Sequence, residues 1–194
     1  VKWVGEAIVN TLLALIKGFR NHRMTHFMAQ RIKAFGTSIF SEMSALAIQH
    51  DAINLSQGFP DFAAPHFIKQ HAINAIQADL NQYAPSNGMR SLHEAIGRSW
   101  QRHYQRELDL AREITATSGA TEAIFDAVMA VVNPNDEVII FEPYYDSYPP
   151  CVLMAGGVPR YVRLAEPDWT LDLELLKAAI TPKTKAIMLN TPHN

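Results

Sequence analysis

The chain has 194 residues, of which 48% are hydrophobic, with a formal net charge of −2 and a single cysteine, Cys151. This composition supports a buried core and excludes a disordered chain, and the charge balance gives no electrostatic case for a nucleic-acid partner. One cysteine excludes an intrachain disulfide and a cysteine-based zinc cluster, and fits a reducing compartment, which we expect to be the cytoplasm. No apolar run approaches the roughly 20 residues that a membrane span needs.

Residues 1–23 differ in character from the rest of the chain. One helical face is possible there, formed by Val4, Ile8, Leu12, Leu15 and Phe19. A secretory signal would need a small-residue cleavage site after the apolar run, whereas charged residues follow it here. The segment is either a membrane-surface helix or an upstream extension, with Met24 as the true first residue, and we favour the extension.

The next part of the chain predicts mainly helices and turns. Apolar periodicity predicts helices over residues 41–49 and 65–80, separated by a brief strand at Ile53 and Leu55 that Gly58 and Pro60 end. A turn-rich loop follows over 82–88. Ser91 and Glu94 form a candidate capping box for a further helix, whose apolar stripe runs from Leu92 to Tyr104.

Residues 113–132 predict a short strand, a tight turn and a helix. The strand covers 114–117, Ser118 and Gly119 form the turn, and the helix begins near Ala120. The open amides and the dipole of a helix start favour a phosphate there, with hydroxyl donors from Ser118 and Thr121. An ordinary turn with Ser118 as the helix N-cap explains the same residues, so both interpretations stay open.

From residue 113 onward strands and helices alternate, which predicts an α/β domain with a mainly parallel sheet. After the helix near 120, the predicted elements are a fully buried strand over 137–141, an aromatic loop over 143–150, a short helix over 151–155, a strand over 158–164, a helix over 173–180 and a buried strand over 185–190.

Ligands of such sheets bind beyond the carboxyl ends of the strands. Three loops are expected at that edge, over residues 118–121, 143–145 and 192–194. They would supply phosphate donors, an aromatic plane and a side-chain amide. That set suits a flat, phosphorylated heteroaromatic cofactor.

Five stretches of sequence carry a resemblance to a known family. They are NLSQGFPDF at 54–62, NQYAP at 81–85, TSGATE at 117–122, FEPYYDSY at 141–148 and LNTPHN at 189–194. In this order they resemble the fold-type I aminotransferases of class I/II, which use pyridoxal 5′-phosphate (PLP), and within them the methionine, kynurenine and glutamine transaminase branch. The resemblance covers residues 31–194.

The resemblance implies a fold and a domain organisation. The fold is the large domain of the PLP-transferase fold type I, an αβα sandwich with a mainly parallel sheet, truncated and preceded by an N-terminal arm. The expected divisions are an extension of uncertain origin over 1–23, an arm or part of a small domain over 24–60, and an incomplete PLP-binding domain over 61–194.

The resemblance also assigns candidate site residues. Gly119 and Ala120 resemble the backbone donors to the PLP phosphate, with Ser118 and Thr121 beside them. Tyr145 is similar to the aromatic residue that stacks on the pyridine ring, and Asn194 to the asparagine that binds its phenolic oxygen. Tyr83 resembles the tyrosine that reaches the phosphate in the partner subunit, which implies a homodimer. Gly58 resembles the residue against which the substrate carboxylate lies.

No catalytic residue is assigned, because the family's Schiff-base lysine is expected beyond Asn194. None of the seven lysines has the sequence context of that lysine. We therefore expect a truncated, inactive piece of an enzyme that moves an amino group from a methionine-like or aromatic amino acid to a 2-oxo acid. A PLP-dependent carbon–sulfur β-lyase and a non-catalytic fragment that dimerises or binds PLP weakly are the alternatives. The histidines are scattered, and we expect no metal site.

Overall fold

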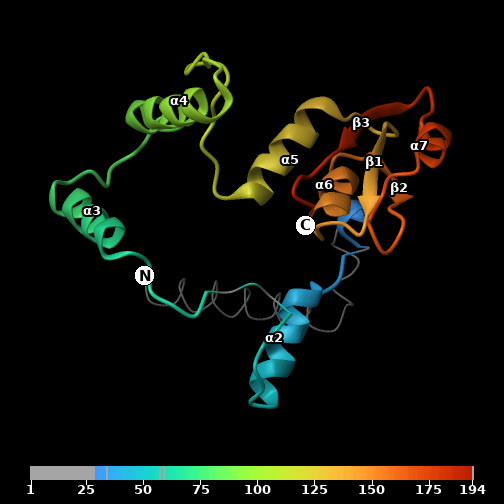
Figure 1. Ribbon diagram of the computed structural model, residues 1–194, viewed down its shortest axis with the longest axis horizontal. Coiled ribbons are helices and arrows are strands. Elements are labelled where there is room, and N and C mark those ends of the chain that lie inside the picture. The colour runs from blue at the N-terminus through green and yellow to red at the C-terminus, as the bar shows by residue number, and fades with distance from the viewer. Residues whose placement is uncertain (1–28, 34, 57, 59, 194) are drawn as a thin grey trace, which may run out of the picture. The chain divides into compact units, whose positions relative to one another are not determined.

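The computed structural model describes residues 29–33, 35–56, 58 and 60–193. The described residues divide into two compact units, one covering 39–127 and one combining the segment before residue 39 with 128–193. We call them the helical unit and the sheet unit. Figure 1 labels their helices and strands. The amphipathic segment expected over 1–23 lies outside the described residues.

Three parallel strands form the sheet of the sheet unit. They are β1 (Glu137–Glu142), β2 (Val158–Arg163) and β3 (Thr184–Met188), in the order β2-β1-β3 (Figure 1). Ile139 of β1 is paired with Arg160 of β2 on one side and Ile187 of β3 on the other. The predicted parallel α/β architecture is therefore confirmed.

β1 is the centre of the core. Val138, Ile139 and Ile140 are fully buried, as the continuous apolar run predicted for a strand covered on both faces. On one face, Ile139 and Phe141 form a cluster with Val162 and Leu164 of the β2 region. The partly buried Leu171, Leu176 and Ala179 pack against that cluster.

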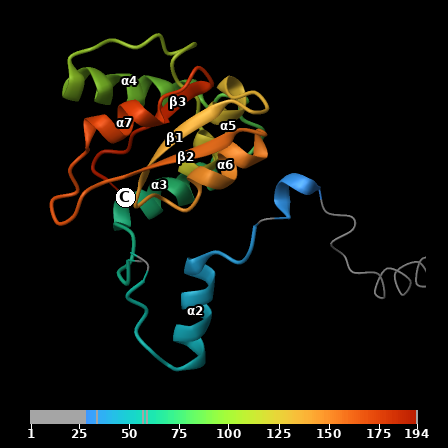
Figure 2. The same cartoon turned by 90° about the vertical axis from the view of Figure 1, so that its right-hand side faces the viewer.

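The connecting helices lie on opposite faces of the sheet. The chain passes from β1 to β2 through α6 (Tyr148–Met154), and from β2 back across β1 to β3 through α7 (Leu173–Ala179). Because both crossovers are expected to be right-handed and run in opposite directions, their helices cover different faces. Figure 2 shows α6 and α7 on the two sides of β1 and β2.

Local sequence explains where these helices start. α6 begins at Tyr148, three residues earlier than predicted, because Pro149 and Pro150 fit a first helical turn, where no intrahelical N–H bond is lost. α7 begins after Asp172, whose carboxylate accepts hydrogen bonds from the amides of Glu174 and Leu175 at 2.8 and 3.3 Å.

A short 3-10 helix, η2 (Gln30–Ile32), packs against α6.

The helical unit contains α2 (Ile39–Gln49), α3 (His66–Gln77), α4 (Arg90–Tyr104) and most of α5 (Ala120–Val131). None of the described residues from 39 to 92 is buried, and Ile53 and Leu55 are 87% and 89% exposed. The strand predicted at these two residues is wrong, because no neighbouring segment within the described residues pairs with them.

The strand predicted over 114–117 is also wrong. This segment carries one backbone hydrogen bond to a neighbour, from the amide of Ala116 to the carbonyl of Asn87 at 2.9 Å, and forms no ladder. β-branched side chains favour extended backbone, but a strand also needs an aligned partner along its length.

α4 differs from its prediction in both its cap and its packed face. The helix starts at Arg90, so Ser91 lies inside it, and Glu94 pairs with Arg90 at 2.9 Å. The buried side chain is His93, whose ring bonds the carbonyl of Asn87 at 2.7 Å, whereas the predicted stripe from Leu92 to Tyr104 is exposed except for the partly buried Ile96. The His93 side of α4 packs on its own flanking loops, which hydropathy alone did not indicate.

None of the described helices is both long and apolar enough to cross a membrane.

Candidate functional site

Two of the three predicted site loops meet at the carboxyl edge of the sheet. β1 ends at Glu142 and is followed by Pro143, and β3 ends at Met188 and is followed by residues 189–193. The ring of His193 bonds the carbonyl oxygen of Pro143, 50 residues away in sequence. Because a carbonyl only accepts, Nε2 of His193 carries the proton and donates it. The crevice between adjacent strands of this kind is where α/β sheets bind ligands.

The loop after β1 is held by two aromatic pairs. Tyr144 stacks on Tyr161 of β2, with ring centroids 5.4 Å apart and planes at 22°. Tyr145, the predicted cofactor-stacking residue, is partly buried and meets Tyr148 edge to face at 5.7 Å and 81°. Desolvation raises the pKa of the Tyr148 hydroxyl, and Tyr145 adds to the rise. Tyr145 is therefore fixed from the α6 side.

The predicted phosphate turn belongs to the helical unit, and α5 starts at Ala120 as predicted. Gly119 has a φ of +88°, in the left-handed region that favours glycine. A side chain built there would meet nothing within 4 Å. Within the described part of the chain, a Cβ at this position therefore meets no steric obstacle.

The amides of this turn are not all available. Gly119 donates to the carbonyl of Thr117 at 2.8 Å, and the amide of Ser118 donates to the carboxylate of Glu122. Ser118 is not the N-cap, since Gly119 stands between it and the helix. Within the described part of the chain, the Ala120 amide has no backbone acceptor. Glu122 brings a negative charge to the positive end of the helix dipole, where it stabilises α5.

Two further predicted site residues, Tyr83 and Gly58, are exposed. Tyr83 is 103% exposed, in the loop before α4, and Gly58 is exposed between two undescribed neighbours. Asn194 lies outside the described residues. His193, which comes directly before it, is described and exposed.

The family model described as "Aminotransferase class I and II" matches residues 50–194. The chain belongs to the class I and II aminotransferase family. It is 43% identical over 164 residues to the methionine aminotransferase of Escherichia coli (strain K12), a match that covers 84% of this chain and 42% of that protein. It is 37% identical over 177 residues to kynurenine–oxoglutarate transaminase 3 of Homo sapiens, covering 86% and 39% of the two chains.

Solved structures agree with this assignment. A structure from Escherichia coli with a reported methionine aminotransferase function is similar at a TM-score of 0.81 and 42% identity, covering 86% of this chain and 44% of that one. An N-succinyldiaminopimelate aminotransferase structure from Mycobacterium tuberculosis matches at 0.81 and 44%, with the same coverage. This aminotransferase chain therefore spans 42% of the length of the first curated relatives it matches.

An ion pair of this aminotransferase chain, with a buried carboxylate and a half-exposed guanidinium, was not predicted from sequence. The carboxylate of Glu137, 4% exposed at the start of β1, accepts hydrogen bonds from Arg160 at 2.6 Å and from the Thr181 hydroxyl at 2.7 Å. These bonds hold the pKa of Glu137 below its usual 4.5, against the opposing effect of burial. The sequence feature that could have indicated this ion pair is the charged residue Glu137 at the start of an otherwise apolar strand. The pair lies at the amino ends of the strands, away from the loops after β1 and β3.

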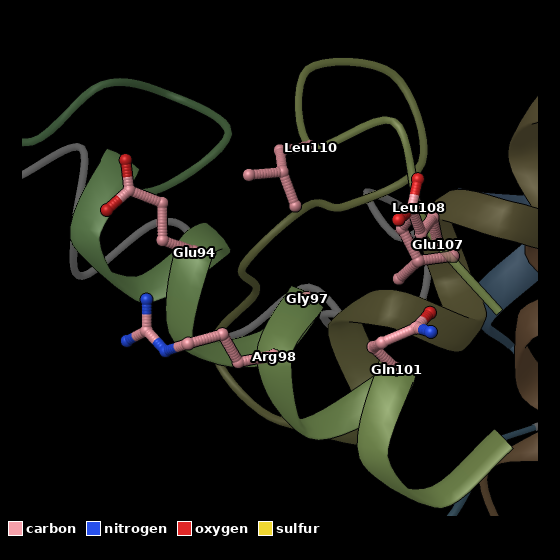
Figure 3. A pocket seen from close by; sticks show the side chains of 7 residues that line it. All are labelled: Glu94, Gly97, Arg98, Gln101, Glu107, Leu108 and Leu110. Carbon is pink, nitrogen blue, oxygen red and sulfur yellow. The ribbon is translucent and has the colours of Figure 1, made fainter. Parts of the chain in front are cut away.

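A charged hollow described in the helical unit contains none of the predicted site residues. It measures about 420 Å³ and lies between α4 and the loop after it, lined by Glu94, Gly97, Arg98, Gln101, Glu107, Leu108 and Leu110 (Figure 3). Leu110 lies against Gly97, where an added side-chain carbon would stand 2.6 Å from it. Among the described residues, no three His, Cys, Asp or Glu side chains gather as a metal site would need.

Proposed function

We propose that these residues are part of a PLP-dependent aminotransferase that moves an amino group from a methionine-like or aromatic amino acid to a 2-oxo acid. Family membership supports amino transfer, and the names of the methionine and kynurenine relatives support the substrate class. The observation that carries most weight is the bond between His193 and Pro143, because it joins the loop bearing Tyr145 to the loop leading to Asn194.

The helix start of α5 fits a phosphate group. Gly119 has the backbone conformation of a tight turn with open space in front of it, and α5 is 12 residues long. The Ala120 amide and the exposed Ser118 hydroxyl would be donors of the kind that a phosphate takes, and Thr121 lies beside them. Glu122 opposes this fit through its charge, so binding requires that a phosphate outcompete its carboxylate at the Ser118 amide.

The remaining site residues each have one role in the proposal. The Tyr145 ring would stack on the pyridine face, and the Asn194 side chain would donate to the phenolic oxygen. Gly58 would lie against the substrate carboxylate. Tyr83 would reach the phosphate of a second subunit, and its full exposure leaves it accessible to one. When bound, PLP supplies an electron sink for the substrate carbanion.

No lysine of this chain is proposed as catalytic. In the sheet unit, Lys177 pairs with Glu174 at 2.7 Å on α7, and Lys183 and Lys185 lie at the amino end of β3, the opposite end from the Tyr145 loop. We therefore propose that the 194 residues by themselves hold the cofactor without turning over substrate.

Two measurements test this proposal. Equilibrium dialysis of the 194-residue chain should show saturable PLP binding that Tyr145→Ala weakens and Tyr104→Ala, at an exposed tyrosine of α4, leaves unchanged. The full-length protein, supplied with methionine or kynurenine and a 2-oxo acid, should release the matching keto product. Non-saturable PLP binding would contradict it. So would cleavage of a cysteine S-conjugate to ammonia, a thiol and pyruvate without amino transfer to the 2-oxo acid, and that result would assign a β-lyase.

A further inference from the structure

We propose that His193 is a positioning residue of the candidate site: its imidazole ties the loop after β3 to the loop after β1 and so fixes the backbone that carries Tyr145. The proposal rests on the proposed function for the identity of the ligand. The tie itself rests on the contact between His193 and Pro143.

Without His193, the loop after β1 is held by contacts to β2 and to α6. Tyr144 stacks on Tyr161 of β2, and Tyr145 meets Tyr148 of α6. The carbonyl of Tyr145 also accepts a hydrogen bond from the amide of Tyr148 at 3.0 Å. All of these contacts lie toward β2 and α6, the direction in which the chain itself continues.

His193 supplies the contact from the β3 side. Pro143 has no amide proton, so its carbonyl is its one backbone hydrogen-bonding group, and His193 occupies it. Because β3 neighbours β1 on the side away from β2, the loop is then held from both flanks. A loop held from both flanks loses less conformational entropy when a ligand binds, which strengthens binding without any new ligand contact.

Two substitutions separate the hydrogen bond from the ring. His193→Phe keeps a planar ring and removes the donor. His193→Gln places an amide donor at the same side-chain reach and should restore the tie. His103→Phe is the matched control, because His103 bonds a carbonyl within its own helix α4, that of Ser99 at 2.8 Å.

The first readout needs no ligand. Hydrogen exchange in the 194-residue chain should quicken in His193→Phe at the amides of Tyr148 and Cys151, whose acceptors are the carbonyls of Tyr145 and Ser147. His193→Gln and His103→Phe should match the unsubstituted chain. Unchanged exchange in His193→Phe overturns the proposal, as does equal quickening in His193→Gln.

The second readout is PLP affinity by equilibrium dialysis. His193→Phe should bind roughly three- to tenfold more weakly, the effect of one net hydrogen bond, with recovery in His193→Gln. Equal affinity in all variants overturns the positioning role while leaving the proposed function intact. If the unsubstituted chain does not bind PLP, the proposed function fails, and the exchange experiment alone then decides whether His193 holds the loop.

Discussion

The Glu137 carboxylate accepts a hydrogen bond from the Arg160 guanidinium at 2.6 Å, joining the amino ends of β1 and β2. Glu137 is buried, while the Arg160 side chain is half exposed. The Thr181 hydroxyl donates a second bond to the same carboxylate, so the segment before β3 is held at this point as well. A single carboxylate therefore links all three strands at the end opposite the candidate site.

Replacing this carboxylate should make stability depend less on pH. The folded-state pKa of Glu137 is lowered, so its contribution is fully present above the unfolded value of 4.5 and is lost as the pH falls through the folded pKa. Glu137→Gln should therefore be less stable than the unsubstituted chain at pH 7, and the difference should shrink below pH 4.5. Urea unfolding followed by circular dichroism at both pH values measures it.

The control for this experiment is an exposed pair in the same unit. Glu166 pairs with Arg163 at 3.1 Å, and both side chains are mostly exposed. Glu166→Gln should change the free energy of unfolding by less than about 0.5 kcal/mol at either pH. A loss in Glu137→Gln that is the same at pH 7 and at low pH would show that the charge of Glu137 contributes nothing.

Alanine at Gly119 should destabilise the turn before α5 through backbone strain alone. The φ of +88° costs an L-residue about 1–2 kcal/mol, and the space around the added carbon is open. Gly36 also has open space but a φ outside the left-handed region, so Gly36→Ala should be neutral or stabilise by about 0.4–1 kcal/mol. Equal effects of the two substitutions on urea midpoints would rule out a strained turn.

Ile140 should be among the most costly side chains to shorten. It is fully buried in the central strand, and Ile140→Ala should lower the free energy of unfolding by about 2–5 kcal/mol. Ile187 of the edge strand β3 is 46% exposed, so Ile187→Ala should cost only about 1 kcal/mol. Thermal and urea unfolding of both variants test the ranking, which would be wrong if the two losses were equal.

Removing the charge of Glu122 should strengthen anion binding at the start of α5. Its carboxylate occupies the Ser118 amide and repels a phosphate, so Glu122→Gln should raise the affinity for inorganic phosphate roughly three- to tenfold. The same change should cost α5 about 0.3–1 kcal/mol of stability, because an acid is lost from its first turn.

Asp126 provides the matched control for Glu122, because it is an exposed acid one turn further along α5. Asp126→Asn should leave phosphate affinity, measured by equilibrium dialysis, close to that of the unsubstituted chain. A similar gain in both variants would indicate a general charge effect rather than competition at the Ser118 amide.

Sequence patterns were informative where one local rule determined the outcome. The apolar run of β1, the start of α5 at Ala120 and the parallel sheet all follow from periodicity and alternation. Sequence patterns failed where strand pairing or side-chain packing depends on segments distant in the sequence. Ile53 and Leu55 have strand propensity but no partner strand among the described residues, and the buried face of α4 carries His93 rather than the apolar stripe.

The candidate site likewise contains residues that could be predicted from sequence and a contact that could not. The motifs around Gly119 and Tyr145 could be recognised from sequence, since each lies within a few consecutive residues. The role of His193 could not, because its partner Pro143 is 50 residues away and the bond depends on β1 and β3 being neighbours.

By itself, the sequence determined most of the helices, the strands of the sheet unit, the parallel α/β class and the family to which the chain belongs, because these depend on side-chain periodicity and on short motifs. Only the tertiary structure decided which residues bond between the loops at the carboxyl edge of the sheet and which charges pair at the other end. The physical reason is strand order: β3 crosses over to lie beside β1, and that choice brings together residues that no local pattern relates.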